Sequence, residues 1–273
     1  MSTNRDPSAI EGRKRWITTM ERAAEPISRR MIELAAVKPG DRVLDLATGS
    51  GDPALAVARI VGAEGEVIGV DMAEPLLDYA RERAREAGIE NATFLAMDAA
   101  SLDLPAESFN AVLCKFGLMF FHDYDSAIGA VHDVLKKGGR FVTSLWGPAA
   151  EVPAISITVE VLREQLDIHP SETPPHPFAL SDPSIVLAKL SDAGFTDLHV
   201  EHYPVIFEFS SPEQYIRYMH DVAHQVNLLF QEITPEERTS VWDAIVERAA
   251  RHVTAEGIVR FENSSFIVVG SRG

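Results

Sequence analysis

Short apolar runs alternate with longer segments of helical periodicity from residue 41 to residue 146, and this alternation constrains the fold more than any other feature of the sequence. The apolar runs predict strands over 42–47, 66–70, 93–97, 110–114 and 140–145. Helices are predicted between them over 53–61, 75–87 and 126–135. Because strands that alternate with helices form parallel sheets, the sequence predicts an α/β fold.

The regions on either side of this alternation are predicted to be mostly helical. Two short helices separated by Pro26 are expected within about 10–36, because proline interrupts the helical hydrogen-bond pattern. After residue 146 the pattern predicts cap helices, a proline-rich loop and two more strands. The helices are expected over 152–166, 183–193, 212–230 and 235–253, the loop over 169–177, and the strands over 196–209 and 260–269.

The first predicted strand leads directly into a glycine-rich turn, Gly49-Ser50-Gly51-Asp52-Pro53-Ala54. Such a turn before a helix is where nucleotide-type cofactors usually bind. The turn matches the G-x-G-x-x-G/A fingerprint of dinucleotide-binding proteins, and Asp71 fits the acidic residue about 20 positions farther on. An NAD(P)-dependent oxidoreductase is therefore one hypothesis.

Two further carboxylates favour a different cofactor. Asp45 lies within the end of the first predicted strand, and Asp98 ends the third. A cofactor with an amino-acid tail, a ribose diol and an adenine has a hydrogen-bond donor for each of the three aspartates, and S-adenosylmethionine carries those groups. Each aspartate alone also fits a helix cap or a turn, but three at consecutive strand ends favour a ligand.

At these segments the sequence resembles the class I S-adenosylmethionine-dependent methyltransferases. Phe116-Gly117-Leu118, and Ala47 where many members have glycine, are most similar to the ubiquinone and menaquinone biosynthesis C-methyltransferases and their small-molecule relatives. The resemblance covers residues from about 40 to 146 and is carried by Val43–Ala54, Val67–Met72, Met97–Ala99 and Leu135–Arg140.

The resemblance implies a seven-stranded, Rossmann-like methyltransferase sheet with an antiparallel last strand and helical cap insertions. The implied parts are an N-terminal helical lid (1–36), an S-adenosylmethionine-binding α/β core (37–146), and a remainder (147–273). In that remainder, cap insertions at about 147–180 and 211–258 are expected to form the substrate site. Trp16 and Met20 are interpreted as core packing, although the lid often covers the site in this family.

The resemblance also implies a cofactor site made of residues that follow successive strands. The methionine end would be held by one carboxylate and by the backbone of the glycine-rich turn, and the ribose and adenine by residues after the second and third strands. The implied residues are Asp45, Ala47 and Gly49 for the methionine end, Asp71 for the ribose diol, Met72 and Leu76 packing on adenine, Asp98 and Ala99 at the adenine amino group, and Lys115 and Phe116 along the sulfonium.

The implied function is methyl transfer to O or C of a small, partly hydrophobic acceptor. Such a displacement needs mainly alignment, and it needs a base only where the nucleophile must lose a proton. His122 is the best-placed histidine for a base, although a loop histidine at a helix cap explains it equally well. Lys115 is a second catalytic candidate, as a cation beside a phenolate or enolate; a lysine that extends to the rim of the site is the favoured interpretation.

Two alternatives stay open beside an active methyltransferase: the oxidoreductase, and a catalytically inactive methyltransferase-like partner subunit. The oxidoreductase would need a hydride-site motif such as Tyr-x-x-x-Lys, whose nearest match, Tyr79 to Arg83, lies in the helix after the second strand. The long insertion between the last two predicted strands departs from the quinone enzymes, so the acceptor and the methylated atom stay open.

Composition limits the partners and the compartment. The chain has 41 acidic and 25 basic residues, a formal charge of -16, which argues against nucleic-acid substrates. No apolar run reaches the roughly 20 residues of a membrane span, and a cytoplasmic location is expected. The single cysteine, Cys114, is expected to be a buried thiol, and His220 and His224 are expected to face solvent, so no metal site is predicted. A homodimer stays open.

Overall fold

The computed structural model describes residues 7–168, 175–222, 230 and 233–273. Their internal contacts divide them into two compact units. The first, which we call the sheet unit, contains the described residues of Glu25–Gly147, Glu172–Tyr203 and Ser265–Gly273. The second, the helical unit, contains those of Met1–Ala24, Pro148–Ser171 and Pro204–Ser264. The three functional parts expected from the sequence, 1–36, 37–146 and 147–273, stay a prediction.

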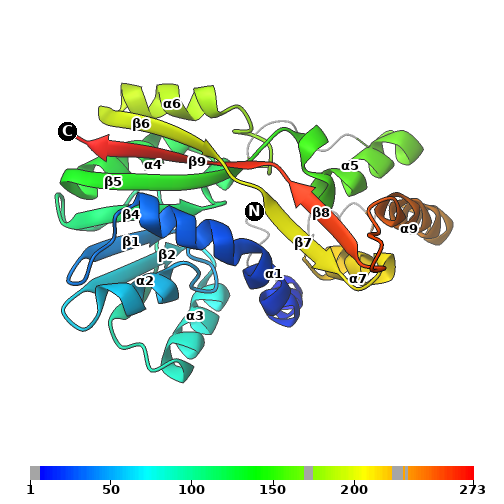
Figure 1. The fold of residues 1–273 in the computed structure, drawn as a ribbon, viewed down its shortest axis with the longest axis horizontal. Coiled ribbons are helices and arrows are strands. Elements are labelled where there is room, and N and C mark those ends of the chain that lie inside the picture. Colours follow the sequence, from blue (N-terminus) through cyan, green and yellow to red (C-terminus); the bar gives the residue numbers. More distant parts are fainter. Residues whose placement is uncertain (1–6, 169–174, 223–229, 231–232) are drawn as a thin grey trace. The chain divides into compact units, whose positions relative to one another are not determined.

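The sheet unit contains one seven-stranded sheet in the order β3-β2-β1-β4-β5-β9-β6 (Figure 1). The first five strands along the chain pair in parallel, whereas β9 is antiparallel to both β5 and β6. This arrangement confirms the predicted Rossmann-like sheet with an antiparallel last strand. The strands are β1 (Arg42–Leu46), β2 (Glu66–Asp71), β3 (Ala92–Ala96), β4 (Phe109–Lys115), β5 (Leu135–Trp146), β6 (Phe195–His202) and β9 (Ser265–Arg272).

The strand order indicates the edge of the sheet at which a ligand can bind. The chain places β2 and β3 on one side of β1, then returns to place β4 and β5 on its other side. Open α/β sheets bind ligands beyond the carboxyl ends of the strands at such a switch point.

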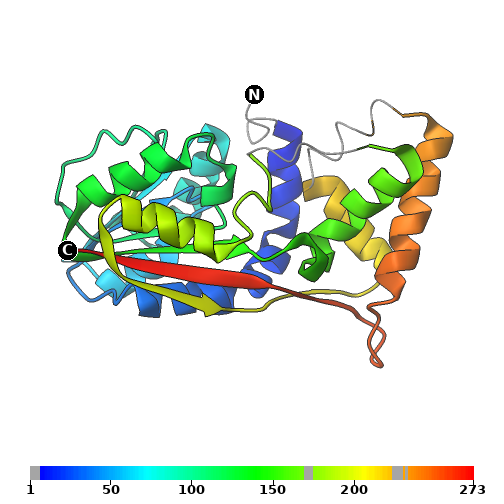
Figure 2. The ribbon, with the colours of Figure 1, turned by 90° about the horizontal axis from the view of Figure 1, so that it is seen from above.

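Helices α4 and α6 of the sheet unit pack against each other (Figure 2). The helices of this unit are α2 (Ala54–Val61), α3 (Glu74–Glu86), α4 (Tyr124–Val134), α6 (Pro183–Asp192) and the short η2 (Leu118–Phe120).

The N-terminal segment forms one helix, α1 (Pro7–Leu34), with Pro26 inside it. The prediction of two short helices is therefore wrong. Proline removes one helical hydrogen bond, but Ile27 and Met31 directly after it are fully buried, and their burial favours continuing the helix. Arg30 adds a forked contact, because its Nε and Nη2 atoms donate to the Glu201 carboxylate on β6 at 2.8 and 2.7 Å.

The two long strands predicted late in the chain are each divided between two sheets. The segment predicted as one strand over 196–209 forms β6 and then β7 (Val205–Phe209), and the segment over 260–269 forms β8 (Val259–Asn263) and then β9. Strands β7 and β8 pair as a separate antiparallel ribbon. Pro204 lies at the first break. Proline has no N–H to donate to a neighbouring strand, so it interrupts a continuous ladder of hydrogen bonds.

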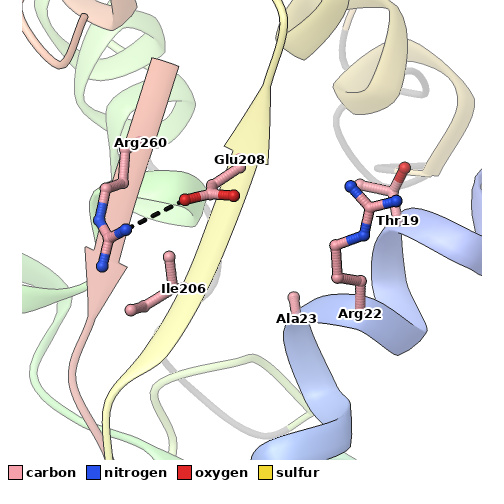
Figure 3. Close-up of a pocket in the computed structure, with 6 residues that line it drawn as sticks. All are labelled: Thr19, Arg22, Ala23, Ile206, Glu208 and Arg260. Atoms are coloured by element: carbon pink, nitrogen blue, oxygen red, sulfur yellow. Dashed lines mark hydrogen bonds and ion pairs between the residues drawn. The ribbon is translucent and has the colours of Figure 1, made fainter. Parts of the chain in front are cut away.

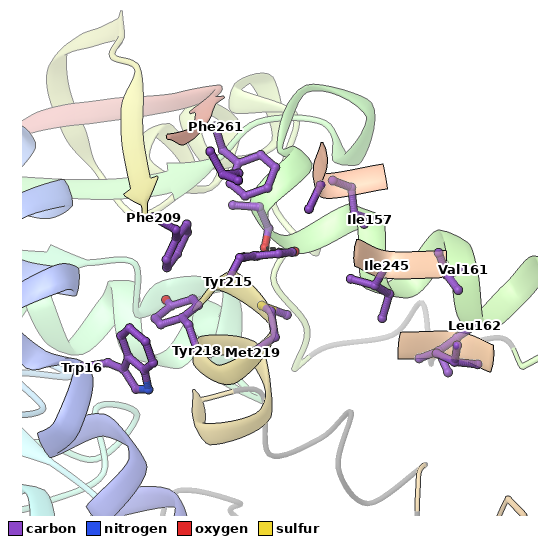
Figure 4. Close-up of a cluster of buried hydrophobic side chains, with 14 of the residues drawn as sticks. Trp16, Ile157, Val161, Leu162, Phe209, Tyr215, Tyr218, Met219, Ile245 and Phe261 are labelled. Atoms are coloured by element: carbon purple, nitrogen blue, oxygen red, sulfur yellow. Dashed lines mark hydrogen bonds between the residues drawn. The ribbon is translucent and has the colours of Figure 1, made fainter. Parts of the chain in front are cut away.

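The helical unit is organised around an aromatic core (Figure 4). Trp16 packs edge-on against Tyr218 at 5.6 Å, and Tyr215 lies 4.7 Å from Phe261 between ring centroids. Trp16 thus packs in this core, with Met20 against it, as interpreted from the sequence. The helices are α5 (Pro153–Leu166), α7 (Pro212–Val222), α9 (Pro235–Ala250) and the short η3 (Ala149–Glu151). Residues 223–229 of the helix predicted over 212–230, and 169–174 of the proline-rich loop, lie outside the described residues.

Candidate functional site

A glycine loop, residues 47–53, connects the end of β1 to the start of α2. The Thr48 amide donates to the Val70 carbonyl at 3.0 Å, which places the loop against the end of β2. Gly49 has a positive φ of 54°, and a β-carbon built there would meet no atom closer than the Ala47 carbonyl oxygen at 4.0 Å. A group outside the loop can therefore approach the backbone at Gly49 closely.

Asp45 lies beneath this loop with its side chain buried at 1% exposure. Its Oδ2 atom accepts hydrogen bonds from the Thr48 hydroxyl at 2.6 Å and the Ala54 amide at 3.2 Å. Its Oδ1 atom is buried and has no hydrogen-bond partner among the described residues. Burial raises the pKa of this carboxyl to about 7, against the opposing effects of the Thr48 hydrogen bond and the Lys115 charge. An unpaired buried acceptor favours a nearby donor or cation.

Asp71 joins the glycine loop to the beginning of α3. Its Oδ2 atom accepts from the Gly49 amide at 3.0 Å, and its Oδ1 atom accepts from the Ala73 amide at 2.9 Å. Met72 beside it is 46% exposed, whereas Leu76, one turn into α3, is buried. One carboxylate thus holds the loop and the end of β2 together.

Asp98 follows the end of β3 by two residues and is exposed. Its Oδ1 atom accepts from the Ala100 amide at 2.9 Å, and Ala99 between them is buried. Strands β3, β2 and β1 are neighbours in the sheet, so Asp45, Asp71 and Asp98 all lie at its carboxyl edge. Asp71 and Asp98 each also stabilise a turn two residues ahead, which is the alternative role noted from the sequence.

Lys115 and Phe116 end β4 and begin the next loop. Lys115 does not extend to the rim as favoured from the sequence; its side chain is 12% exposed and forms an ion pair with Asp52. Phe116 has a positive φ of 50°, and its amide donates to both the carbonyl and the hydroxyl of Ser144 at 3.1 Å. Its ring stacks on Trp146 with 4.1 Å between centroids. These contacts hold a backbone conformation that is costly for a residue with a side chain.

His122 follows η2 and is exposed. The residue that caps α4 is its neighbour Asp123, whose Oδ1 accepts from the Ser126 amide at 2.9 Å. Within the described part of the chain, no hydrogen bond of the His122 side chain is found. Its role as a base stays a prediction.

The sequence did not predict the contacts of Asp52 and Ser28 with Lys115, or of Trp146 with Phe116. The helix predicted over 53–61 would make Asp52 its N-terminal cap, but α2 begins at Ala54 and its cap residue, Pro53, forms no side-chain cap hydrogen bond. The Asp52 carboxylate instead meets Lys115, which only the fold brings near. An aspartate and a lysine 63 positions apart give no local signal of their pairing.

The helical unit contains a separate cavity of about 170 Å³ between α1 and the β7–β8 ribbon (Figure 3). A Glu208–Arg260 ion pair of 3.0 Å borders it, with Thr19, Arg22, Ala23 and Ile206. None of the predicted site residues lines this cavity. Among the described residues, no group of three or more His, Cys, Asp or Glu side chains is placed to hold a metal ion, and His224 lies outside them. No described helix combines the length and apolar character that a membrane span needs.

The parallel sheet, the glycine loop after β1 and the carboxylates along one edge define the class of Rossmann-like domains built for a nucleotide-type cofactor. Comparison with known proteins narrows this class. Residues 37–170 match the family described as "Methyltransferase domain". Residues 37–170 are therefore similar to this methyltransferase family, and the relatives described next include ubiquinone and menaquinone biosynthesis C-methyltransferases.

Individual relatives support this assignment over part of their length. A demethylmenaquinone methyltransferase of Thermus thermophilus is 45% identical over 121 residues, covering 44% of this chain and 54% of the relative. The ubiquinone/menaquinone biosynthesis C-methyltransferase UbiE of Teredinibacter turnerae is 40% identical over 112 residues, covering 41% and 45%. The chain thus spans about half the length of these curated relatives. The solved YcgJ protein of Bacillus subtilis shares the fold, with a TM-score of 0.59 and 23% identity over 90% of this chain and 97% of that one.

Proposed function

We propose that the chain is an S-adenosylmethionine-dependent methyltransferase that acts on a small, partly hydrophobic acceptor. The observation that carries this proposal is the unpaired, buried Oδ1 atom of Asp45 beneath a glycine loop whose outer face is open at Gly49. A cofactor with a cationic amino-acid tail fits that pair of features better than a pyrophosphate does, because a buried carboxylate repels an anion. The methyltransferase relatives support the same conclusion.

The residues of the chain would mainly bind and align. Asp45 with the backbone at Ala47 and Gly49 would hold the methionine end, and Asp71 the ribose hydroxyls. The exposed Met72 side chain offers apolar surface to the adenine ring, and Asp98 an acceptor for its amino group. The bound cofactor supplies an electrophilic methyl group on positively charged sulfur.

The remaining residues of the predicted site would surround the adenine ring and the reacting groups. Leu76 and Ala99 would form the apolar side of the adenine site, and the Phe116 ring would border the sulfonium. His122, which is exposed just after η2, would accept a proton where the acceptor must lose one.

The acceptor is proposed only as a class. The matched part of the relatives covers less than half of this chain, so their quinone substrates do not transfer to it. The segments 147–180 and 211–258 are proposed to bind the acceptor, on the strength of their apolar and aromatic residues. A cytoplasmic location, the exclusion of nucleic acid and a homodimer stay predictions.

Calorimetric titration with S-adenosylmethionine, S-adenosylhomocysteine and NAD tests the proposal, followed by mass spectrometry of candidate acceptors for a gain of one methyl group. We expect binding of both adenosyl ligands and no binding of NAD. Tight NAD binding without a response to the adenosyl ligands would refute it in favour of an oxidoreductase. Adenosyl binding without turnover over a broad acceptor panel would instead favour a catalytically inactive partner subunit.

A further inference from the structure

Lys115, Asp52 and Ser28 form a side-chain cluster that joins three separate segments of the sheet unit. Lys115 is the last residue of β4, Asp52 lies in the glycine loop, and Ser28 lies on α1. The Lys115 ammonium forms an ion pair with the Asp52 carboxylate and donates to the Ser28 hydroxyl at 3.1 Å. That hydroxyl in turn donates to Asp52 Oδ2 at 3.4 Å. The three side chains are mostly buried, so water screens their charges weakly.

The Lys115 charge lies where it can act on the proposed cofactor. Strands β1 and β4 are neighbours, with Asp45 paired to Leu113, so Lys115 follows at the carboxyl edge of the sheet beside the glycine loop. Its charge also reaches Asp45, whose pKa it lowers against the effect of burial. An uncompensated ammonium at this edge would repel a cationic ligand.

We propose, on the basis of the function proposed above, that Asp52 neutralises Lys115 so that a cationic sulfonium can bind at this edge, while Lys115 positions the glycine loop against β4 and α1. Lys115 is then a positioning residue, and the ion pair sets the preference between the charged cofactor and its neutral product. S-adenosylmethionine carries the sulfonium cation, whereas S-adenosylhomocysteine has an uncharged thioether in the same place. The two ligands therefore report the local charge separately from the shape of the site.

The contacts of Lys115 favour this role over that of a cation beside the acceptor. Two of the three ammonium donors are directed at Asp52 and Ser28, and both partners belong to the chain. A lysine that stabilised a phenolate or enolate would need its charge available to the acceptor. In the ion pair that charge is already balanced by a carboxylate.

The test is the ratio of the two dissociation constants, Kd for S-adenosylmethionine over Kd for S-adenosylhomocysteine, measured by calorimetry in the full chain. Asp52→Asn leaves the lysine uncompensated, and we expect the ratio to rise by about tenfold. Lys115→Met leaves the carboxylate unpaired, and the ratio should fall by about fivefold. The double variant removes both charges and should return the ratio to within about twofold of the parent value. Ser28→Ala, which removes the hydroxyl that accepts from Lys115 and donates to Asp52 but leaves both charges in place, is the matched control and should leave the ratio unchanged.

Each outcome decides the matter. If Asp52→Asn and Lys115→Met weaken both ligands equally, the pair has only a structural role and the inference is overturned. If Asp52→Asn does not fold, as thermal unfolding would show, the opposite shift expected of Lys115→Met still carries the test. If the parent protein binds neither adenosyl ligand, the proposed function itself fails. That result is distinct from an unchanged ratio in a protein that binds both.

Discussion

Asp45 predicts a specific dependence of stability on pH. Its pKa is raised from 3.8 to about 7 because the carboxyl is buried, so between these values the folded protein holds a proton that the unfolded chain has released. The contribution of Asp45 to the free energy of unfolding is therefore fully present below pH of about 4 and is lost as the pH rises to about 7. A shift of about three units corresponds to about 4 kcal/mol, at about 1.4 kcal/mol per unit.

Asp45→Asn removes this titration while keeping an oxygen that can accept from Thr48 and Ala54. Urea unfolding of the ligand-free protein at several values between pH 4 and pH 8 measures the difference. We expect the parent protein to lose stability relative to Asp45→Asn as the pH rises, by up to about 4 kcal/mol over the whole range. Other titrating groups contribute to both proteins and cancel in the comparison.

The same carboxyl should release a proton when a cationic ligand binds, because the ligand favours its charged form. Near pH 7 about half of the Asp45 population is protonated, so the parent protein should release about half a proton more per bound ligand than Asp45→Asn. Titrations with S-adenosylmethionine in two buffers of different ionisation enthalpy give this number. Equal proton release, together with parallel pH profiles of stability, would refute the assignment of a buried, unpaired carboxyl.

Three further substitutions, two of them paired with a comparison variant, test other contacts of the structure. Asp71→Ala removes the acceptor for the Gly49 amide and should weaken S-adenosylmethionine binding by about 1.5–3 kcal/mol in calorimetry, with a smaller loss for Asp71→Asn; unchanged affinity would contradict the role of this carboxylate. Gly117→Ala would place a β-carbon 2.6 Å from that of Ala47, so chemical unfolding should show that the free energy of unfolding falls by about 1–3 kcal/mol. A β-carbon added by Gly129→Ala in α4 meets no neighbour, so this comparison variant should raise the free energy of unfolding by about 0.5–1 kcal/mol. Asn263→Ala removes the buried amide that donates to the Val205 carbonyl and accepts from the Ala154 amide, and it should lower the free energy of unfolding by about 2–4 kcal/mol; parental stability would show that these hydrogen bonds contribute little.

Much of the sheet, and the positions of the three carboxylates at its carboxyl edge, could be predicted because their signals are local. Short apolar runs, together with the residues that follow them, predict the strand ends at Asp45, Asp71 and Asp98. Helix α1 was misjudged because burial after Pro26 outweighs a local penalty, and burial depends on the rest of the fold. The late strands were misjudged because alternation predicts an extended chain but not its pairing partner, and β7 pairs with β8 instead of continuing along the seven-stranded sheet.

The sequence by itself determined the α/β class, the position of the glycine loop and the three carboxylates along one edge, since each follows from periodicity and spacing within a few dozen residues. Only the tertiary structure decided how charges and aromatic rings from distant segments meet. Lys115 pairs with Asp52 and reaches Ser28, 87 positions away in the chain, and Phe116 stacks on Trp146. Contacts of this kind depend on packing across the whole unit, and no local pattern encodes them.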